Sequence, residues 1–322
     1  MSIESSTLKF SGHQTFPLRY GWIYKIIQEV KAGRSISSKE MIDKQMVYMG
    51  VGKNMVLSIR HWIKTLGLVT SSKEQAQDFE LTPLAEKLFV GTKEEPAYDE
   101  FMDKVGTVWL IHWLSQSISP SKFELNTPRW FFNFYNGVRC DKQQIAADIN
   151  AALEQGGREV TEATLKKDID CFLQTYSVKS SSKGSKVNED SFTSPFTELG
   201  LLEQVDAKSY VAELSTRKSL PVEVFAYALI DFIKKKHNVK VDSQERTFSF
   251  DSLLKDVGSP GKVFRLTEQG LSEKLDELQK LSEGMLAWTD TQGLRQLRHE
   301  FEDISTVSPE MYLESYYKKR DK

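Results

Sequence analysis

Residues 37–88 contain the pattern that most constrains the fold of this chain. The segment 37–40, Ser-Ser-Lys-Glu, has the spacing of a helix capping box and predicts a short helix directly after it. Gly50 and Gly52 predict a turn, and a second helix is predicted from Lys53 to Leu66. Apolar residues recur along this helix at intervals of three and four positions, which predicts one buried stripe formed by Val56, Ile59, Ile63 and Leu66.

Two strand-like pieces and another helix follow. Residues 68–71 and 78–82 have strand character and are joined by a polar turn, and residues 83–88 form a further helical segment. The order helix, turn, helix and two-stranded hairpin predicts a winged helix-turn-helix. A generic small α+β unit is the alternative interpretation.

The next segment, residues 92–136, is predicted to be mainly helical and is rich in aromatic side chains. Such a cluster is more typical of a protein core than of a platform for base stacking, and both interpretations stay open. Its members are Trp109, Trp113, Trp130, Phe131, Phe132, Phe134 and Tyr135.

A second helix pair is predicted after the aromatic segment. The first helix covers 143–155 and ends at a Gly-Gly pair, and Thr161 caps the second. Lys166 and Lys167 lie on the polar face of that second helix. The pattern fits a further winged-helix-like unit and fits a helical bundle equally well.

The rest of the chain completes a mainly α (α+β) fold class, with an N-terminal winged helix-turn-helix followed by helical and further winged-helix-like domains. A helix is predicted over 221–236, and residues 248–281 predict a strand, a helix, a turn at 258–261, another strand and a long helix. Four segments are predicted, namely a DNA-binding domain over 1–95, an aromatic-rich helical domain over 96–176, a polar linker over 177–197 and an α+β domain over 198–322.

Charge is distributed unevenly along the chain. The net charge is −2, yet residues 1–70 carry ten Lys or Arg against four Asp or Glu. This excludes a uniformly basic coat protein and suits a protein that meets a polyanion with one end. Two cysteines exclude a disulfide framework, and the longest apolar run, 105–114, is too short to span a bilayer. We therefore expect a soluble cytoplasmic protein with no membrane partner.

The helix over 53–66 carries the predicted DNA-binding face. Lys53, Arg60 and Lys64 are seven and four residues apart and are predicted to share one solvent face, with Asn54 and His61 beside them. The alternative is an ordinary solvated helix face. The predicted DNA contacts are Lys53, Asn54, Arg60, His61, Lys64, Lys166 and Lys167.

Catalytic motifs are scarce in the sequence. The five histidines are scattered, and neither a phosphate-cradling Gly-x-x-x-x-Gly-Lys nor a Gly-x-Ser-x-Gly elbow occurs, so no nucleotide cofactor is expected. The acidic groups Asp168/Asp170 and Glu300/Glu302/Asp303 are expected to decorate exposed helix faces.

His13 and Arg19 are the candidate catalytic residues. A His near an Arg can transfer a proton at a phosphate while the Arg balances charge. The alternative is that both are structural and bind the loop to the first helix. A metal-dependent nuclease needs converging carboxylates, and spacing does not single out Asp190, Glu198 or Asp251 for that role.

Residues 10–22, Phe-Ser-Gly-His-Gln-Thr-Phe-Pro-Leu-Arg-Tyr-Gly-Trp, resemble a motif of the bacterial domain-of-unknown-function family 4007. The resemblance continues over nearly the whole chain, at 51–56, 190–192, 195–201, 259–266 and 290–295.

That family is similar to the nicking subunit of single-strand DNA phosphorothioation systems, which defend bacteria against phage. The resemblance implies a DNA-nicking endonuclease dependent on Mg²⁺ or Mn²⁺, with His13 and Arg19 as site residues by their place in the motif. It also implies partners, namely a cysteine desulfurase, an ATP pyrophosphatase and an ATPase. Homo-oligomerisation, a non-enzymatic DNA-binding adaptor and a protein-binding scaffold stay open, and the metal ligands are unknown.

Overall fold

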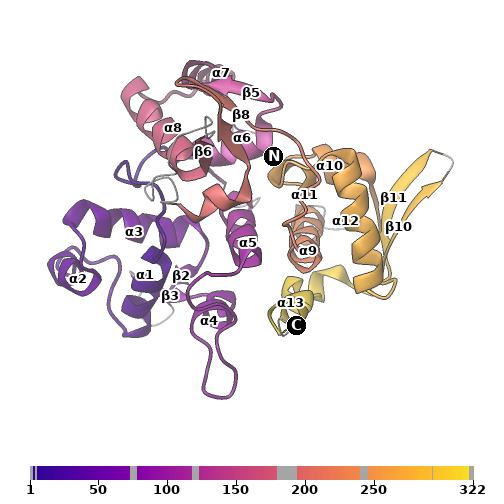
Figure 1. Cartoon of the computed structure of the whole chain (residues 1–322), viewed down its shortest axis with the longest axis horizontal. Helices are drawn as coiled ribbons and strands as arrows, with labels where there is room; N and C mark the ends of the chain where they lie inside the picture. Colours follow the sequence, from indigo (N-terminus) through magenta and orange to yellow (C-terminus); the bar gives the residue numbers. More distant parts are fainter. Residues whose placement is uncertain are drawn as a thin grey trace, which may run out of the picture.

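The computed structural model describes residues 3, 6–72, 78–117, 123–179, 194–239, 246–291 and 293–318. The chain is mainly helical with small sheets of two to four strands. Its elements group into an N-terminal unit (α1–α4), a middle unit (α5–β8) and a C-terminal unit (α9–α13), and α5 lies between the other groups of helices (Figure 1).

The N-terminal unit has the order of elements that the sequence predicts. Its elements are α1 (Trp22–Lys31), α2 (Ile42–Met49), α3 (Lys53–Thr65), β2 (Val69–Ser71), β3 (Phe79–Leu81) and α4 (Pro83–Phe89). β2 and β3 pair antiparallel. The stripe on α3 is confirmed, because Val56, Ile59, Ile63 and Leu66 are all buried.

The predicted capping box before α2 is wrong. Met41 is the N-cap of α2 and makes no side-chain cap hydrogen bond. The Ser38 hydroxyl instead accepts a hydrogen bond from the Glu40 backbone N–H at 3.1 Å, in a turn that precedes the helix. Serine hydroxyls stabilise local turns as readily as helix starts, so the spacing alone does not decide between them.

The aromatic segment forms core, as expected. It supplies α5 (Val105–Gln116), β4 (Glu124–Leu125), which pairs parallel with β1 (Thr7–Leu8), and α6 (Thr127–Phe134). Trp109, Trp113, Phe131 and Phe132 are no more than 1% exposed, so these rings pack against protein and are not a surface for bases.

The predicted helix pair is present in the middle unit. The remaining elements of this unit are β5 (Arg139–Asp141), α7 (Lys142–Glu154), α8 (Glu162–Tyr176), β6 (Ser177–Lys179), η3 (Pro195–Leu199), β7 (Leu202–Gln204) and β8 (Ser209–Val211). The strand order is β5-β8-β7-β6. The linker prediction was wrong at both ends, since 177–179 pair with β7 and 194–197 are buried. Residues 180–193 lie outside the described residues.

The C-terminal unit carries a projecting hairpin. Its elements are α9 (Val222–Val239), β9 (Thr247–Ser249), α10 (Phe250–Lys255), α11 (Pro260–Val263), α12 (Glu268–Leu281), β10 (Leu286–Thr291), β11 (Leu294–His299), η4 (Ile304–Thr306), η5 (Pro309–Tyr312) and α13 (Leu313–Tyr317). The β10–β11 hairpin extends away from the body (Figure 1), and its strands form a sheet in the order β10-β11-β9.

The strand predicted after the 258–261 turn is wrong. Ser259 caps α11, since its hydroxyl accepts a hydrogen bond from the Lys262 N–H, and Pro260 occupies the first turn of the helix. Proline is favoured at that position because the N–H that it lacks has no partner inside a helix.

A fully buried joint links the middle and C-terminal units. The Phe264 ring lies against Trp109 and Trp113 of α5, with centroids 5.6 and 5.5 Å apart. Beside it, His112 Nε2 lies 2.9 Å from the Val263 carbonyl oxygen, and Nδ1 lies 2.9 Å from the Tyr176 hydroxyl. Burial lowers the pKa of His112 to about 3, so the ring is neutral.

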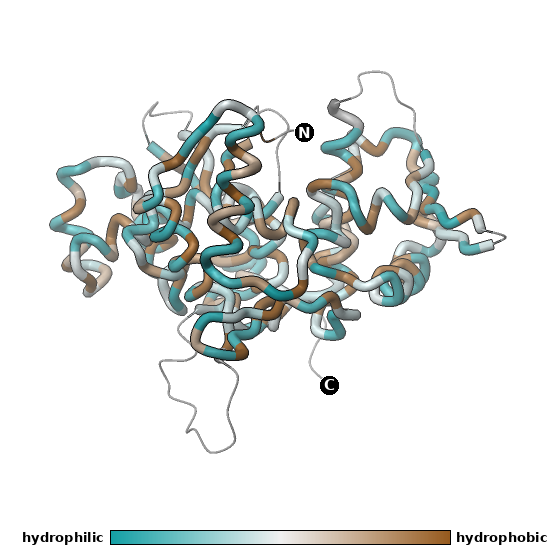
Figure 2. The backbone as a smooth tube through the Cα atoms, turned by 90° about the horizontal axis from the view of Figure 1, so that it is seen from above, coloured by the Kyte–Doolittle hydropathy of each residue, from teal (hydrophilic) through white to brown (hydrophobic). Residues whose placement is uncertain are grey.

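Hydropathy along the backbone is consistent with this packing. Apolar and polar residues alternate along most helices (Figure 2), as expected of helices that bury one face. Within the described parts of the chain, no helix is long and apolar enough to cross a membrane.

Phe264→Ala is expected to lower the free energy of unfolding by about 3–5 kcal/mol, because it leaves a cavity among aromatic side chains. Urea denaturation followed by tryptophan fluorescence measures the change. The control is Leu294→Ala on the hairpin, where the native side chain is 56% exposed and the expected change is within about 0.5 kcal/mol. Equal effects of the two variants would contradict the assignment of Phe264 to the joint.

Candidate functional site

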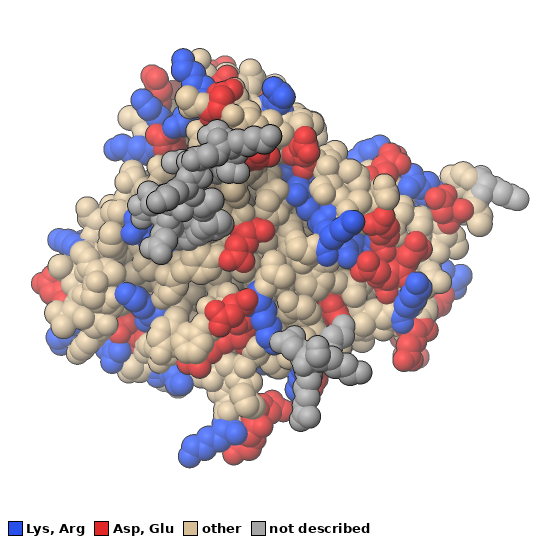
Figure 3. All heavy atoms as spheres, in the orientation of Figure 1, with Lys and Arg blue, Asp and Glu red and all other residues tan. Residues whose placement is uncertain are grey.

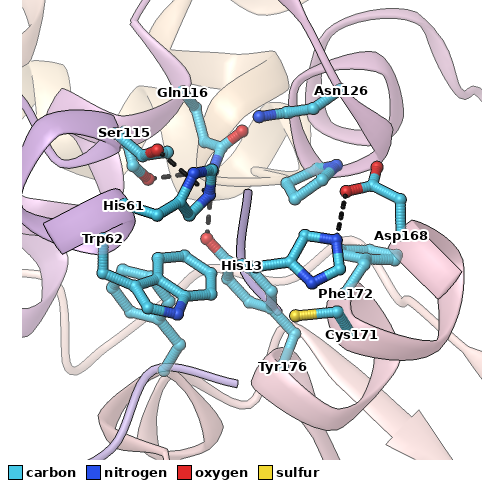
Figure 4. Close-up of a pocket in the computed structure, with 13 residues that line it drawn as sticks. His13, His61, Trp62, Ser115, Gln116, Asn126, Asp168, Cys171, Phe172 and Tyr176 are labelled. Carbon is cyan, nitrogen blue, oxygen red and sulfur yellow. Dashed lines mark hydrogen bonds and ion pairs between the residues drawn. The ribbon is translucent and has the colours of Figure 1, made fainter. Parts of the chain in front are cut away.

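A small cavity lies where the loop at residues 11–16 meets α3 and α8. Its volume of about 20 Å³ is sufficient for one water molecule. Figure 4 shows the side chains around it converging from α3, α5, α6, α8 and the loop. The lining residues are His13, His61, Trp62, Thr65, Ser115, Gln116, Asn126, Pro128, Asp168, Cys171, Phe172, Tyr176 and Phe196.

His13 and Asp168 form the polar centre of this cavity. The Thr15 backbone N–H donates to His13 Nδ1 at 3.0 Å, so the ring proton of neutral His13 resides on Nε2. His13 Nε2 lies 3.2 Å from Asp168 Oδ1, and the Thr127 N–H donates to Asp168 Oδ2 at 2.8 Å. Both side chains are buried, each residue being 5% exposed. The pair therefore joins the loop to α8 and to the start of α6.

Gly12 permits the close approach of this loop to α3. Its φ is +113°, and a Cβ atom at this position would lie 2.5 Å from His61 Nδ1. At the other end of the loop, the Phe16 carbonyl accepts hydrogen bonds from Trp62 Nε1 at 3.1 Å and from the Cys171 thiol at 3.3 Å. Any side chain at position 12 would displace the His61 ring.

His61 lines the cavity and is half-buried. Its ring lies edge-on to His13, with centroids 6.0 Å apart, and its Nε2 is 3.3 Å from the Thr65 hydroxyl. Burial, followed by the charge of His13, lowers the pKa of His61 to about 4, and Lys9 and Arg129 add to the decrease. His61 is therefore neutral at pH 7.

Arg19 does not join His13. Its guanidinium carbon lies 5.7 Å from the ring centroids of both Phe16 and Trp22, and it is not among the residues that line the cavity. The structure therefore does not bring together the two residues proposed as a catalytic pair.

The burial of Arg60 contradicts part of the predicted DNA-binding face. It is 6% exposed, and its guanidinium donates to Gln45 Oε1 and to the Ser38 carbonyl, both at 2.8 Å. Arg60 therefore holds α3 against α2 and the preceding turn, and the prediction that it shares a solvent face with Lys53 and Lys64 is wrong. The residues that do face solvent are Lys53, Asn54, Lys64, Lys166 and Lys167.

The two acidic groups do not lie where the sequence predicted them. It was expected on an exposed helix face, yet it is buried beside His13, while Asp170 pairs with Lys142. The second acidic group does not lie on a helix face as expected, because Glu300 and Glu302 are in a loop and Asp303 is the N-cap of η4.

Carboxylates do not converge in the part of the chain that the structure describes. Asp251 is largely exposed beside Lys255, and the Glu198 carboxylate contacts the Tyr20 hydroxyl. Asp190 lies outside the described residues. No group of three or more His, Cys, Asp or Glu in the described ranges is placed to hold a metal ion.

The cavity itself does not fit Mg²⁺. Mg²⁺ prefers several oxygen ligands in octahedral geometry. Asp168 is the only carboxylate that lines this cavity, and it already faces the His13 ring and the Thr127 N–H.

Sequence reasoning identified His13 but missed its partners. Asp168 and Thr127 are far from His13 in the sequence, and spacing within one helix gives no information about contacts over such separations. The one local signal was the Gly12-His13 pair, since a glycine beside a polar residue in a loop is typical of close backbone packing.

The comparisons with known proteins identify a family and a fold. A family model described as a protein of unknown function (DUF4007) matches residues 10–317. Two solved structures, a magnesium ion-bound SspB and an SspB, are similar, with TM-scores of 0.77 and 0.75. Each is 25% identical, and each match covers 98% of this chain and 90% of the other. No curated protein matches.

Asp168→Ala is expected to lower the free energy of unfolding by about 3 kcal/mol, because it removes the acceptor of the buried Thr127 N–H and the carboxylate beside the buried His13 ring. Asp170→Ala is the matched control on the same helix, with an expected loss below about 1 kcal/mol because its ion pair is partly exposed. Urea denaturation measures both. A loss in the Asp170 variant as large as in the Asp168 variant would contradict the buried role.

The low pKa of His61 predicts acid destabilisation. The unfolded state binds a proton near pH 6.5, whereas folded His61 binds it near pH 4, so stability is lost as the pH falls through this window. His61→Gln is expected to show a shallower loss, by up to about 3 kcal/mol at pH 4. Urea midpoints measured from pH 7 to pH 4 test this, and parallel curves would contradict it.

Proposed function

The chain belongs to the DUF4007 family, and from that premise we propose that it is a DNA-binding component of a bacterial DNA phosphorothioation system that defends against phage. The observation that carries the proposal is the likeness to SspB over 98% of this chain. The motif at residues 10–22 resembles a family that is similar to the nicking subunit of such systems. We take SspB to be that subunit.

The order of elements in each unit is consistent with winged-helix-like units, which commonly bind DNA. In the N-terminal unit, the hairpin β2–β3 follows α3, which we interpret as a winged helix with α3 as its recognition helix. When the short elements β6, η3 and α11 are set aside, the middle and C-terminal units share the order helix, strand, helix, helix, strand, strand, through α6-β5-α7-α8-β7-β8 and α9-β9-α10-α12-β10-β11. We interpret them as further winged-helix-like units.

Surface charge favours the first two of these units as the DNA-binding part. α3 exposes Lys53 and Lys64, and α8 exposes Lys166 and Lys167. The corresponding helix α12 exposes four acids, and acidic side chains gather where it lies in Figure 3. An acidic helix face repels phosphates, so we assign no DNA contact to α12. These acids are Glu268, Glu273, Asp276 and Glu277.

The finer proposal is that the protein nicks DNA. A nick would open the backbone so that sulfur supplied by a cysteine desulfurase, an ATP pyrophosphatase and an ATPase could be incorporated. The magnesium ion in one SspB structure favours a divalent metal for this step. The described carboxylates do not form a magnesium site, so we assign no residue to the metal. His13 and Arg19 stay candidates by their motif only.

A non-enzymatic adaptor is the second candidate function. The specific observation that favours it is that the described residues contain no cluster able to hold a metal, while they do expose lysines on α3 and α8. An adaptor would bind DNA and recruit the enzymes that transfer sulfur.

Relaxation of a supercoiled plasmid tests nicking. We expect open-circle product with Mg²⁺ or Mn²⁺ and none with EDTA, because the proposed hydrolysis needs a divalent ion. The activity should stay with the protein through a second purification. A mobility shift without relaxation would refute intrinsic nicking and support the adaptor, and the absence of both would leave a protein-binding scaffold.

The salt dependence of DNA binding tests the lysine assignment. Lys166→Ala/Lys167→Ala is expected to decrease the slope of log K against log salt by about two, since each lost phosphate contact removes about one counterion. Lys318→Ala, on the far C-terminal helix end, is the control and should leave the slope unchanged. Identical slopes for all three proteins would contradict a role of α8 in DNA binding.

A further inference from the structure

The tip of the loop at residues 11–15 is strained and exposed. Gln14 and Thr15 have φ values of +50° and +64°, in the left-handed region that side chains other than glycine rarely adopt. Both residues face solvent, although the residue before them, His13, is 5% exposed. A backbone conformation that costs free energy and points polar side chains outward is typical of a functional contact.

His13, buried beneath the loop tip, holds the backbone of Gln14 and Thr15 in its strained conformation. Its Nδ1 accepts the Thr15 N–H, which fixes the turn, and its Nε2 faces Asp168 at 3.2 Å. Asp168 is held in turn by the Thr127 N–H at the start of α6. This chain of contacts anchors the tip to two helices of the middle unit.

Two exposed lysines belong to the segments that meet at the loop. Lys9, just before the loop, and Lys64 on α3 are both exposed. Lys9 and Arg129 also disfavour a positive charge on His61, beneath the tip. Of the acids near this region, Asp168 is buried, Glu124 is shared between Lys9 and Arg129, and Asp78 is half-buried and acts on Lys64. Lys9 and Lys64 are therefore the exposed basic side chains that a phosphate near the loop could meet.

The loop also lies between the two helices assigned to DNA. Its contacts run to Trp62 on α3 and to Cys171 on α8, and Figure 1 shows the indigo loop beside both helices. The loop therefore contacts both helices that carry the exposed lysines.

We propose that Gln14 and Thr15 form a contact to the DNA phosphate backbone and that His13 and Asp168 are positioning residues that hold this contact in its strained shape. The inference rests on the proposed DNA binding and specifies which loop carries it. The Gln14 amide can donate to a phosphate oxygen, whereas the Thr15 hydroxyl donates to the Gln14 carbonyl and helps fix the turn. The cavity below holds at most about one water molecule, so in this inference His13 acts by positioning the loop, a role separate from the catalytic one that its motif suggests.

The double variant Gln14→Gly/Thr15→Gly separates function from stability. Glycine adopts positive φ without strain and keeps the Thr15 N–H bond to His13, so the melting temperature is expected to stay equal or rise. The Kd for a 20-base-pair duplex, measured by fluorescence anisotropy, is expected to weaken about tenfold, as for loss of a hydrogen bond to a charged group. The change should be similar for duplexes of unrelated sequence.

Gln143→Ala is the control, because Gln143 is an exposed glutamine on α7, away from the loop. If wild type and this control bind DNA and the double glycine variant binds equally well, the tip is not a contact. If the loss is confined to one DNA sequence, the assignment to the phosphate backbone is wrong. If wild type itself binds no DNA, the proposed function fails first, and this inference fails with it.

Two substitutions of His13 test the positioning role. In His13→Asn the side-chain oxygen takes the place of Nδ1 and can still accept the Thr15 N–H, whereas in His13→Gln the amide takes the place of Nε2 and faces Asp168 instead. Both should lower the melting temperature, since each loses one buried contact. DNA affinity is expected to be retained within about twofold in the Asn variant and to fall about tenfold in the Gln variant. Equal affinities in the two variants would overturn the positioning role.

Discussion

The buried carboxylate of Asp168 is the contact on which the arrangement of the first two units depends. It accepts a hydrogen bond from the Thr127 N–H and faces His13, so one side chain of α8 joins the start of α6 to the loop that precedes α1. A buried charge without partners costs several kcal/mol, and Asp168 is therefore compatible with the interior only while both contacts persist. The same contacts determine the shape of the loop tip.

The aromatic joint has a different role, because it is apolar and connects the other pair of units. Phe264 packs on Trp109 and Trp113, and the neutral His112 beside it bonds to the Val263 carbonyl. Packing of this kind tolerates little change in volume, so the C-terminal unit is firmly placed against α5. Its helix α12, with four exposed acids, thus has a defined position relative to α3, which exposes lysines.

The sequence predicted the elements of this fold better than their contacts. The helix over 53–66 follows from the spacing of Val56, Ile59 and Ile63, because the hydrophobic period is a local property. The burial of Arg60 does not follow from spacing, since it depends on Gln45 and the Ser38 carbonyl lying opposite. The same holds for the candidate site. The local motif predicted His13, but its partner Asp168 could be identified only from the packing of α8 against the loop.

The contrast between Arg60 and the loop tip shows how polar residues can be sorted by function. Arg60 was expected at the surface, and it is buried with its Nε and Nη1 atoms on protein acceptors, which is typical of a structural residue. Gln14 and Thr15 are the opposite case, because their backbone is strained while their side chains remain exposed. Strain that lowers stability persists in a marginally stable protein when it serves another purpose. On this argument Arg60 holds α3 in place against α2, and Lys53 and Lys64 give α3 its exposed positive charge. The polar contact that we propose to the DNA backbone comes from the loop beside α3.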